Sequence, residues 1–225
     1  MSDLRCLTVF LLSMIVVSTP GNTAADFDWQ EVHSDGNIVV KQRDVPGSGY
    51  KETQGRMQTD ASLFAILAVL KDSSACAKWL YKCKHGETVS TISTAERVYY
   101  TVIDAPLLLR DRDMYVRSRV AWDPTRERID IALSGVAGYA PERKGTVRVQ
   151  DLRGQWVVQR TADDHLLLIY QIYSNPQVVP KSAANRMMIR SVSDTLKNVS
   201  RLARSKKYSA ASLSAEELDA LTQVK

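Results

Sequence analysis

The sequence predicts a single α+β domain in which an antiparallel sheet wraps around one long helix near the C-terminus. Two observations lead to this prediction. Short segments with strand-like alternation follow one another through brief turns, which favours an antiparallel meander over alternating strand–helix–strand units. A single long amphipathic segment then follows them. The composition, with 44% hydrophobic and 24% charged residues, is that of an ordinary globular protein.

The long segment runs from Gln177 to Ser205 and contains neither proline nor glycine after Pro180. A proline suits the first position of a helix, where its missing N–H would have no partner anyway. At about 1.5 Å per residue, some 25 helical residues span roughly 37 Å. We expect the sheet to cover the apolar stripe of this helix, with a pocket left between the two. The stripe repeats at steps of three and four and comprises Ala184, Met188, Val192, Thr195, Val199 and Leu202.

The remaining elements are expected in chain order. Asp26 to Gln30 suggests a short lead-in helix, and Asp60 is a suitable N-cap for the apolar segment after it. A second short helix is expected over 73–82. In the tail, Ser214 and Glu217 form a capping-box pattern that predicts a peripheral helix. The expected strands are 37–42, 50–59, 88–93, 96–103, 114–122, 128–133, 146–151, 155–161 and 165–173.

Residues 1–25 resemble a secretory signal peptide. An apolar run of about a dozen residues is followed by small residues, with Thr23 and Ala25 at the −3 and −1 positions. The run is short for a membrane span. We therefore expect cleavage before Asp26 and export, most simply to a bacterial periplasm; an uncleaved anchor is the alternative. The domain then covers 26–208, followed by a tail over 209–225.

Two cysteines, Cys76 and Cys83, remain after this segment. On one unbroken helix a spacing of seven residues separates them by about 10.5 Å, whereas a disulfide needs Cα atoms about 4.4–6.8 Å apart. A bridge therefore requires the helix to end between them, and two separately buried thiols are the alternative. A metal site is not expected, because His85 is the only imidazole nearby.

The formal net charge of +5 favours weak attraction to anionic membranes or nucleic acid, or reflects an ordinary solvated surface. The basic residues are dispersed along the chain, so we expect no nucleic-acid partner. The sequence also lacks G-x-S-x-G, H-E-x-x-H and glycine-rich phosphate-loop motifs. We therefore assign no catalytic residue and expect no cofactor.

Three short segments resemble one known family. Pro141 to Arg148 (PERKGTVR) is similar to the P-E-Q-K-G-V-I-R segment of the steroidogenic acute regulatory protein. Val179 to Asn185 (VPKSAAN) is similar to the L-P-K-S-x-x-N that opens the last helix of that family, and Arg112-Asp113 matches a third motif. The three occur in the expected order, and the likeness covers roughly 29–204. On these residues the chain is identified as a member of the START (StAR-related lipid-transfer) domain family.

The resemblance implies a helix-grip fold, in which a curved antiparallel sheet of about nine strands surrounds the C-terminal helix. One hydrophobic ligand would lie in a tunnel between them; known ligands of the family are sterols, phospholipids and sphingolipids. We therefore expect a non-enzymatic protein that binds one lipid and carries or senses it, with transient membrane contact. The alternatives are a cyclase-like or hydrolase-like enzyme acting on an apolar molecule in the same pocket, and a lipid-responsive protein that docks an unknown partner.

Residues expected to line the tunnel come from two strands and the long helix. Ordinary core packing without a ligand would use the same residues. In the cholesterol-binding relative a Glu–Arg pair lies in the tunnel; Ser118 stands in place of that arginine, and Tyr99 or Tyr100 lies near the glutamate position. Arg117 or Arg119 would replace the arginine only if the strand register shifts by one. The full set is Val98, Tyr100, Val102, Met114, Val116, Ser118, Met188, Val192, Thr195 and Val199.

By the same resemblance, the loop containing Leu107, Leu108 and Leu109 gates the tunnel, and Val178 and Val179 form the opposite lip. Burying a leucine is worth about 1.5–3 kcal/mol, so three leucines suit a transient membrane contact, to which Arg110 and Arg112 would add attraction for anionic head groups. The alternatives are structural. The leucines fold back as core, the valines form a hydrophobic staple on the helix, and Arg112 pairs with Asp111 or Asp113.

Overall fold

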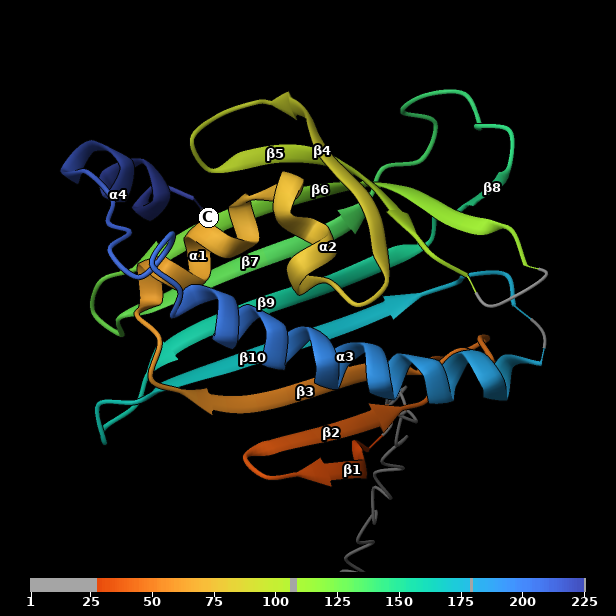
Figure 1. The fold of residues 1–225 in the computed structure, drawn as a ribbon, viewed down its shortest axis with the longest axis horizontal. Helices are drawn as coiled ribbons and strands as arrows, with labels where there is room; N and C mark the ends of the chain where they lie inside the picture. The colour runs from red at the N-terminus through yellow and green to blue at the C-terminus, as the bar shows by residue number, and fades with distance from the viewer. Residues whose placement is uncertain (1–27, 106–108, 179, 225) are drawn as a thin grey trace, which may run out of the picture.

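The computed structural model describes residues 28–105, 109–178 and 180–224. Figure 1 shows its helices lying in front of one large sheet. The elements are β1 (Gln30–Asp35), β2 (Ile38–Arg43), β3 (Glu52–Thr59), α1 (Leu63–Lys71), the 3₁₀ helix η1 (Ser73–Ala75), α2 (Cys76–Trp79), β4 (Cys83–Thr91), β5 (Glu96–Ile103), β6 (Asp111–Asp123), β7 (Arg128–Gly135), β8 (Thr146–Arg148), β9 (Leu152–Arg160), β10 (Leu166–Ser174), α3 (Lys181–Ala203) and α4 (Ala215–Thr222).

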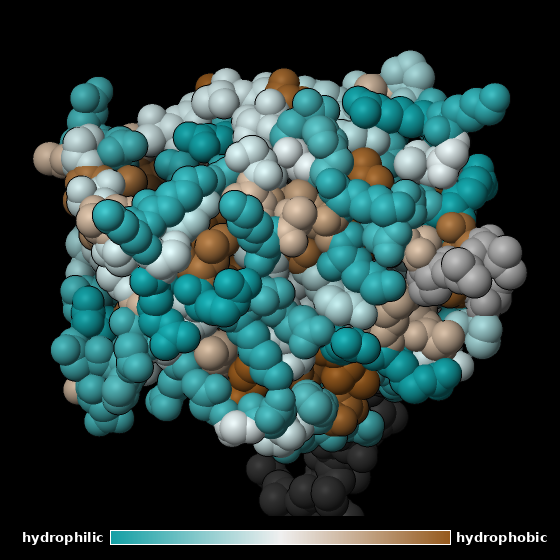
Figure 2. Space-filling model, viewed as in Figure 1, coloured by the Kyte–Doolittle hydropathy of each residue, from teal (hydrophilic) through white to brown (hydrophobic). Residues whose placement is uncertain are grey.

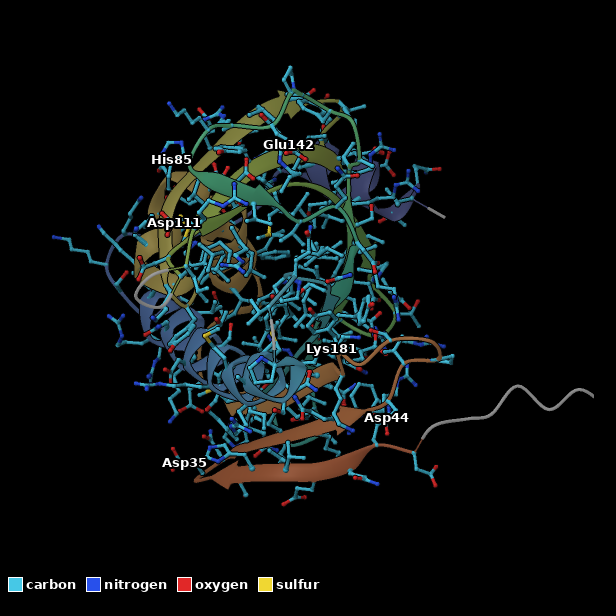
Figure 3. All side chains as sticks on the ribbon, turned by 90° about the vertical axis from the view of Figure 1, so that its right-hand side faces the viewer. Asp35, Asp44, His85, Asp111, Glu142 and Lys181 are labelled. Carbon is cyan, nitrogen blue, oxygen red and sulfur yellow. A yellow bond between two sulfur atoms is a disulfide. The ribbon has the colours of Figure 1, made fainter. Side chains whose placement is uncertain are left out.

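Nine of the strands form one antiparallel path in the order β1-β2-β3-β10-β9-β7-β6-β5-β4. The short strand β8 lies off this path and pairs in parallel with β6. Because β3 pairs with β10, the first three strands extend the sheet beside its last strand. Seen from the side, the sheet curls from β1 toward β4 and β5 and partly encloses α3 (Figure 3). The predicted helix-grip architecture, a curved antiparallel sheet of about nine strands holding a C-terminal helix, is confirmed.

Helix α3 is amphipathic, as the sequence predicts. The basic side chains placed off the stripe, Arg186, Arg190, Lys197, Arg201 and Arg204, are exposed, and this face of the molecule is largely hydrophilic (Figure 2). The opposite face of α3 is buried against the sheet and α1. Pro180 is the N-cap of this helix, one position earlier than expected.

The C-terminal half of α3 is packed without a gap. Val192, Leu196 and Val199 are each 0% exposed and belong to the main hydrophobic core. Gly55 of β3 allows the close approach, because a Cβ added at this glycine would lie 2.5 Å from Val192 Cγ1 and 2.6 Å from Leu196 Cδ1. The stripe therefore holds the helix on the sheet over this half.

The N-terminal region and the short helices differ from expectation. Gln30 to Asp35 forms the exposed edge strand β1, which the sequence analysis did not predict, and residues 28–29 are not helical. Helix α1 is capped by Ser62, whose hydroxyl accepts the Ala65 N–H, and not by Asp60. The expected helix over 73–82 is two short turns, because the chain leaves the helix after Trp79 to enter β4.

The tail helix α4 forms where predicted, with the Ser214–Glu217 capping box present in both directions. It packs on the domain, since Leu221 is 1% exposed and lies within the main core cluster. The proposed signal segment, residues 1–25, lies outside the described residues. Within the part of the chain that is described, no helix is both long and apolar enough to cross a membrane.

Candidate functional site

A cavity of about 230 Å³ lies between the concave face of the sheet and the helices. Its floor is formed by β5, β6, β7, β9 and β10, and its cover by the end of α1, by η1 and α2, and by the first half of α3. Most of the lining is apolar. Trp156 and Tyr170, whose rings stack 4.0 Å apart, form part of the floor. This cavity is where a hydrophobic molecule would fit.

The residues predicted to line the tunnel from β6 and from the beginning of α3 do lie in the cavity wall. Met114, Val116 and Ser118 line the cavity from β6, and Met188 lines it from α3. Met187 and Ser191, which the sequence analysis did not select, also contribute from α3. A methionine is unbranched and adapts to irregular ligands. That these residues contact a ligand stays a prediction.

The prediction for β5 is wrong by one residue. Tyr99, Thr101 and Ile103 line the cavity, whereas Val98, Tyr100 and Val102 face the other side. Those three pack there with Tyr115, Val136 and Ala140. The reason is that β5 is covered on both faces, so both sets of alternate residues include large side chains such as tyrosine and a β-branched aliphatic residue. The period of two therefore does not indicate which face is concave.

The prediction for the second half of α3 is also wrong. Val192 and Val199 belong to the solid core and do not reach the cavity. Thr195 is completely buried, and its hydroxyl accepts the backbone N–H of Tyr81 at 3.1 Å. It therefore fixes the chain that leaves α2 against α3. The helical stripe is continuous in sequence, but α1 and the β2–β3 strands fill the space beneath its second half.

The wall made by α1, η1 and α2 was missed. Leu70, Trp79 and Leu80 line the cavity from this side, and the sequence showed them only as apolar helical positions. A disulfide joins Cys76 to Cys83, with Cα atoms 5.8 Å apart, and so fixes α2 to the start of β4. The helix ends between the two cysteines, as the bridge requires.

One end of the cavity, referred to below as the mouth, lies where β5, β6 and the loop before α3 meet, next to the predicted gate loop. Arg112 of β6 lines the mouth, and its Nε donates to the carbonyl of Pro176 at 3.0 Å. Val178 is buried, and its backbone N–H and carbonyl both bond to the hydroxyl of Tyr50 at 3.1 Å. The suggested pairing of Arg112 with Asp111 or Asp113 is therefore wrong: this guanidinium holds the β10–α3 loop through backbone carbonyls.

The two flanks of the predicted gate loop are tied together by charge. Lys84 Nζ lies 2.8 Å from Asp104 and 2.9 Å from Asp111, and Asp111 also accepts the Ala105 N–H at 3.1 Å. Hydrogen bonds to these carboxylates raise the pKa of Lys84. Leu109 is 46% exposed. The other predicted gate residues, Leu107, Leu108 and Val179, lie outside the described residues.

The residues of the three family-like motifs connect the elements around the cavity through hydrogen bonds and an ion pair. Arg148 forms an ion pair with Asp113 and donates to the carbonyl of Ala140 at 3.0 Å. Burial alone would raise the pKa of Asp113, but the hydrogen bond and charge of Arg148 outweigh it and lower that pKa. Asn185 at the start of α3 accepts the Lys51 N–H at 2.9 Å and donates to the Gly49 carbonyl at 3.1 Å. The motifs thus hold strands, loop and helix together.

The register of β5 and β6 decides whether Arg117 or Arg119 takes the place of the tunnel arginine of the cholesterol-binding relative. Arg117 and Arg119 point away from the cavity and pair with Glu96, so neither replaces it. Tyr99 faces the cavity and Tyr100 does not. Arg97 stands directly opposite Ser118 in the β5–β6 pairing, and nothing in its local sequence indicates this position. Among the described residues, no cluster of His, Cys, Asp and Glu is suited to hold a metal ion.

No family model matches the chain. An uncharacterized protein of Pseudomonas aeruginosa is 27% identical over 195 residues, which cover 86% of this chain and 95% of that protein. A crystal structure of a STAR-related lipid transfer protein (fragment 25–204) from Xanthomonas axonopodis matches with a TM-score of 0.72 and 26% identity, over 79% of this chain and 99% of that one. The human StAR-related lipid transfer protein 5 matches with a TM-score of 0.70 and 16% identity, over 82% and 88%.

Proposed function

We propose, from the match of the fold to START (StAR-related lipid-transfer) domains, that the chain is a member of this family, binds one hydrophobic molecule in the cavity and carries or senses it at a membrane. The observation that supports this most directly is the cavity itself. It is enclosed by the sheet and α3 and is lined mostly by apolar side chains. Apolar sites with a few placed polar groups are typical of small-molecule binding.

A binding role is favoured over catalysis by the state of the polar groups at the mouth. Arg112 is engaged with the carbonyl of Pro176, and Asp104 is engaged with Lys84. Catalysis needs a nucleophile, base or acid converging on one point where substrate reacts. The polar side chains of the described lining, among them Tyr81, Thr101, Tyr170 and Ser191, are instead distributed around the cavity wall.

The test is to measure lipid binding and to fill the cavity. Native mass spectrometry of protein purified from its own host is expected to show a hydrophobic adduct. Val116→Trp places a large ring inside the cavity and is expected to abolish uptake of a fluorescent fatty acid or sterol from vesicles. Ile92→Trp adds the same ring at a residue that is 53% exposed and is the matched control. An unmodified mass, together with no uptake of any lipid by the unaltered protein, would refute the proposal.

The proposal includes a membrane contact at the mouth. Leu109 is exposed there beside Arg110, so an apolar and a basic side chain are available together to an anionic bilayer. Opening this end requires the Lys84 bridge between Asp104 and Asp111 to break. Lys84→Met is therefore expected to speed lipid transfer between vesicles, whereas Lys41→Met, which removes a cation from the distant strand β2, leaves the rate unchanged. A slower rate for the Lys84 variant would contradict this arrangement.

We also propose that the protein works outside the cytoplasm, most simply in a bacterial periplasm. The support is the signal-like segment 1–25 and the Cys76–Cys83 bridge, since disulfides persist mainly in oxidising compartments. N-terminal sequencing of the protein from cell fractions tests this. A mature chain that begins at Asp26 in the periplasmic fraction is the expected result, and an intact N-terminus in the cytoplasmic fraction would contradict it.

A further inference from the structure

Two cations lie toward the end of the cavity away from the mouth: Lys71 is in its lining, and Arg97 is not in the lining but is placed near it by the strand pairing. Lys71 is the last residue of α1 and lines the cavity. Arg97 stands directly opposite Ser118 in the β5–β6 pairing, and Ser118 lines the cavity. Directly paired residues on neighbouring strands point to the same face of a sheet. Arg97 therefore extends from the concave face, six residues or roughly 20 Å along β5 from Ile103 at the mouth.

Neither cation is neutralised by a carboxylate in direct contact. Arg97 Nε is buried and has no hydrogen-bond partner among the residues that the structure describes. Burial and the charge of Arg97 lower the pKa of Lys71, and the carboxylate that opposes this is Glu217. Glu217 already accepts the Ser214 N–H at 2.9 Å in the capping box of α4. The charges of Lys71 and Arg97 both lower the pKa of Glu217, but no carboxylate forms an ion pair with either cation in the part of the chain that the structure describes. Partly buried positive charge that is not fully compensated is unfavourable, so this end of the cavity is suited to receive an anion.

Neutral hydrogen-bond donors lie beside the two cations. Tyr99 lines the cavity next to Arg97; burial raises the pKa of Tyr99, and the charge of Arg97 opposes that shift. The Ser118 hydroxyl is buried on the neighbouring strand. A guanidinium, an ammonium and two hydroxyls are the groups that recognise carboxylates and phosphates in proteins. These four donors therefore lie toward one end of a mostly apolar cavity.

We propose that the cavity takes an amphipathic lipid with a single apolar chain and an oxyanion head, a carboxylate or a phosphate monoester, whose head lies between Lys71 and Arg97 and whose chain runs toward the mouth. This inference rests on the proposed lipid-binding function and adds the class of ligand. The volume of about 230 Å³ is below the roughly 300–1,000 Å³ of sites for drug-sized ligands. It therefore favours one chain over a two-chain phospholipid.

The experiment compares three ligands of equal chain length: hexadecanoic acid, hexadecyl phosphate and hexadecanol. Their dissociation constants are measured by displacement of an uncharged fluorescent probe at pH 8, where both acids are ionised. We expect at least one of the two anions to bind at least about tenfold tighter than the alcohol, the factor that 1.4 kcal/mol represents. Lys71→Met and Arg97→Met are each expected to remove most of that difference and to leave the affinity for hexadecanol unchanged.

The matched control is Arg117→Met, which removes an arginine next to Ser118 in sequence but on the other face of the sheet, where it pairs with Glu96. It is expected to leave the preference for the anion intact. Unchanged hexadecanol binding shows that a variant is folded; Lys71→Gln and Arg97→Gln replace any methionine variant that is not.

The possible outcomes distinguish a failure of the proposed ligand class from a failure of the proposed lipid-binding function. Equal affinity for acid, phosphate and alcohol, or a preference that survives in the Lys71 and Arg97 variants, overturns the inference and leaves the lipid-binding function standing. If the probe binds but none of the three ligands displaces it, the inference about the ligand fails and the proposed function stands; if the probe does not bind either and no lipid is taken up, the proposed function itself fails. Displacement by inorganic phosphate alone, at the concentrations at which hexadecyl phosphate acts, would assign the site to a free anion and overturn the lipid assignment.

Discussion

Arg148 Nη2 lies 2.8 Å from Asp113 Oδ2, and the two side chains are 3% and 0% exposed. The pair joins two of the family-like motifs, which are far apart in sequence. Tyr100 donates to the same carboxylate at 3.2 Å, and the Arg148 guanidinium lies 4.8 Å from the Tyr115 ring centroid. The ion pair is therefore the centre of the packing on the face of β5 and β6 that points away from the cavity.

Removing one member of this pair leaves a buried charge alone. Arg148→Met is expected to lower the free energy of unfolding by about 3–5 kcal/mol, measured by urea denaturation. Arg153→Met, which removes an arginine that lies over the Tyr173 ring without an ion pair, is the control and should cost much less. The double variant Asp113→Leu/Arg148→Met removes both charges and should recover part of the loss. No recovery would contradict the view that the lone charge is the cause.

Asp72 gives the stability a defined pH dependence. Burial would raise its pKa, but hydrogen bonds from Lys207, Ser74 and Tyr208 outweigh this and hold the pKa well below its usual range. A carboxyl with a lowered folded pKa contributes stability above its unfolded pKa of about 3.9 and loses it as the pH falls toward the folded pKa. We expect Asp72→Asn to be less stable than the parent at pH 6 and to show a shallower loss of stability between pH 5 and 2. Parallel pH profiles would refute this.

The Cys76–Cys83 bridge closes a short loop. The chain-entropy model gives about 2.5 kcal/mol for a loop of this length, so Cys76→Ser/Cys83→Ser is expected to lose roughly that much free energy of unfolding. Because the bridge holds a wall of the cavity, the variant should also bind lipid more weakly. The measurement is thermal unfolding with and without a reductant. The variant should not respond to the reductant, and a parent protein that is equally insensitive would contradict the prediction.

Gly55 tests the close packing of α3 on β3. Gly55→Ala places a methyl group against Val192 and Leu196, and overpacking of this kind costs about 1–3 kcal/mol. Val192→Ala in the same chain opens space for the new methyl group, so the double variant is expected to be more stable than the sum of the single changes predicts. Additive losses in urea unfolding would mean that the two residues do not press on each other.

How far the sequence could predict the site is clear from particular residues. The sequence places Met114 and Ser118 on the cavity wall because they alternate with Arg117 and Arg119, which favour the opposite face of β6. Tyr100 was placed wrongly because the opposite face of β5 is also covered, by Val136 and Ala140. Arg97 was not considered at all, since a single arginine in a strand gives no local sign that it faces a cavity.

The sequence by itself determined the α+β class, the position and water-facing side of α3, the capping of α4 and the conditions for the disulfide. These depend on periodicity, capping residues and turn chemistry, which act within a few residues of the chain. Only the tertiary structure decided which face of β5 lines the cavity, which half of α3 packs in the solid core, and that Arg97 extends toward the end of the cavity that Lys71 lines. Those outcomes depend on strand register and on which distant segment fills a given space, and neither is encoded in any one stretch of residues.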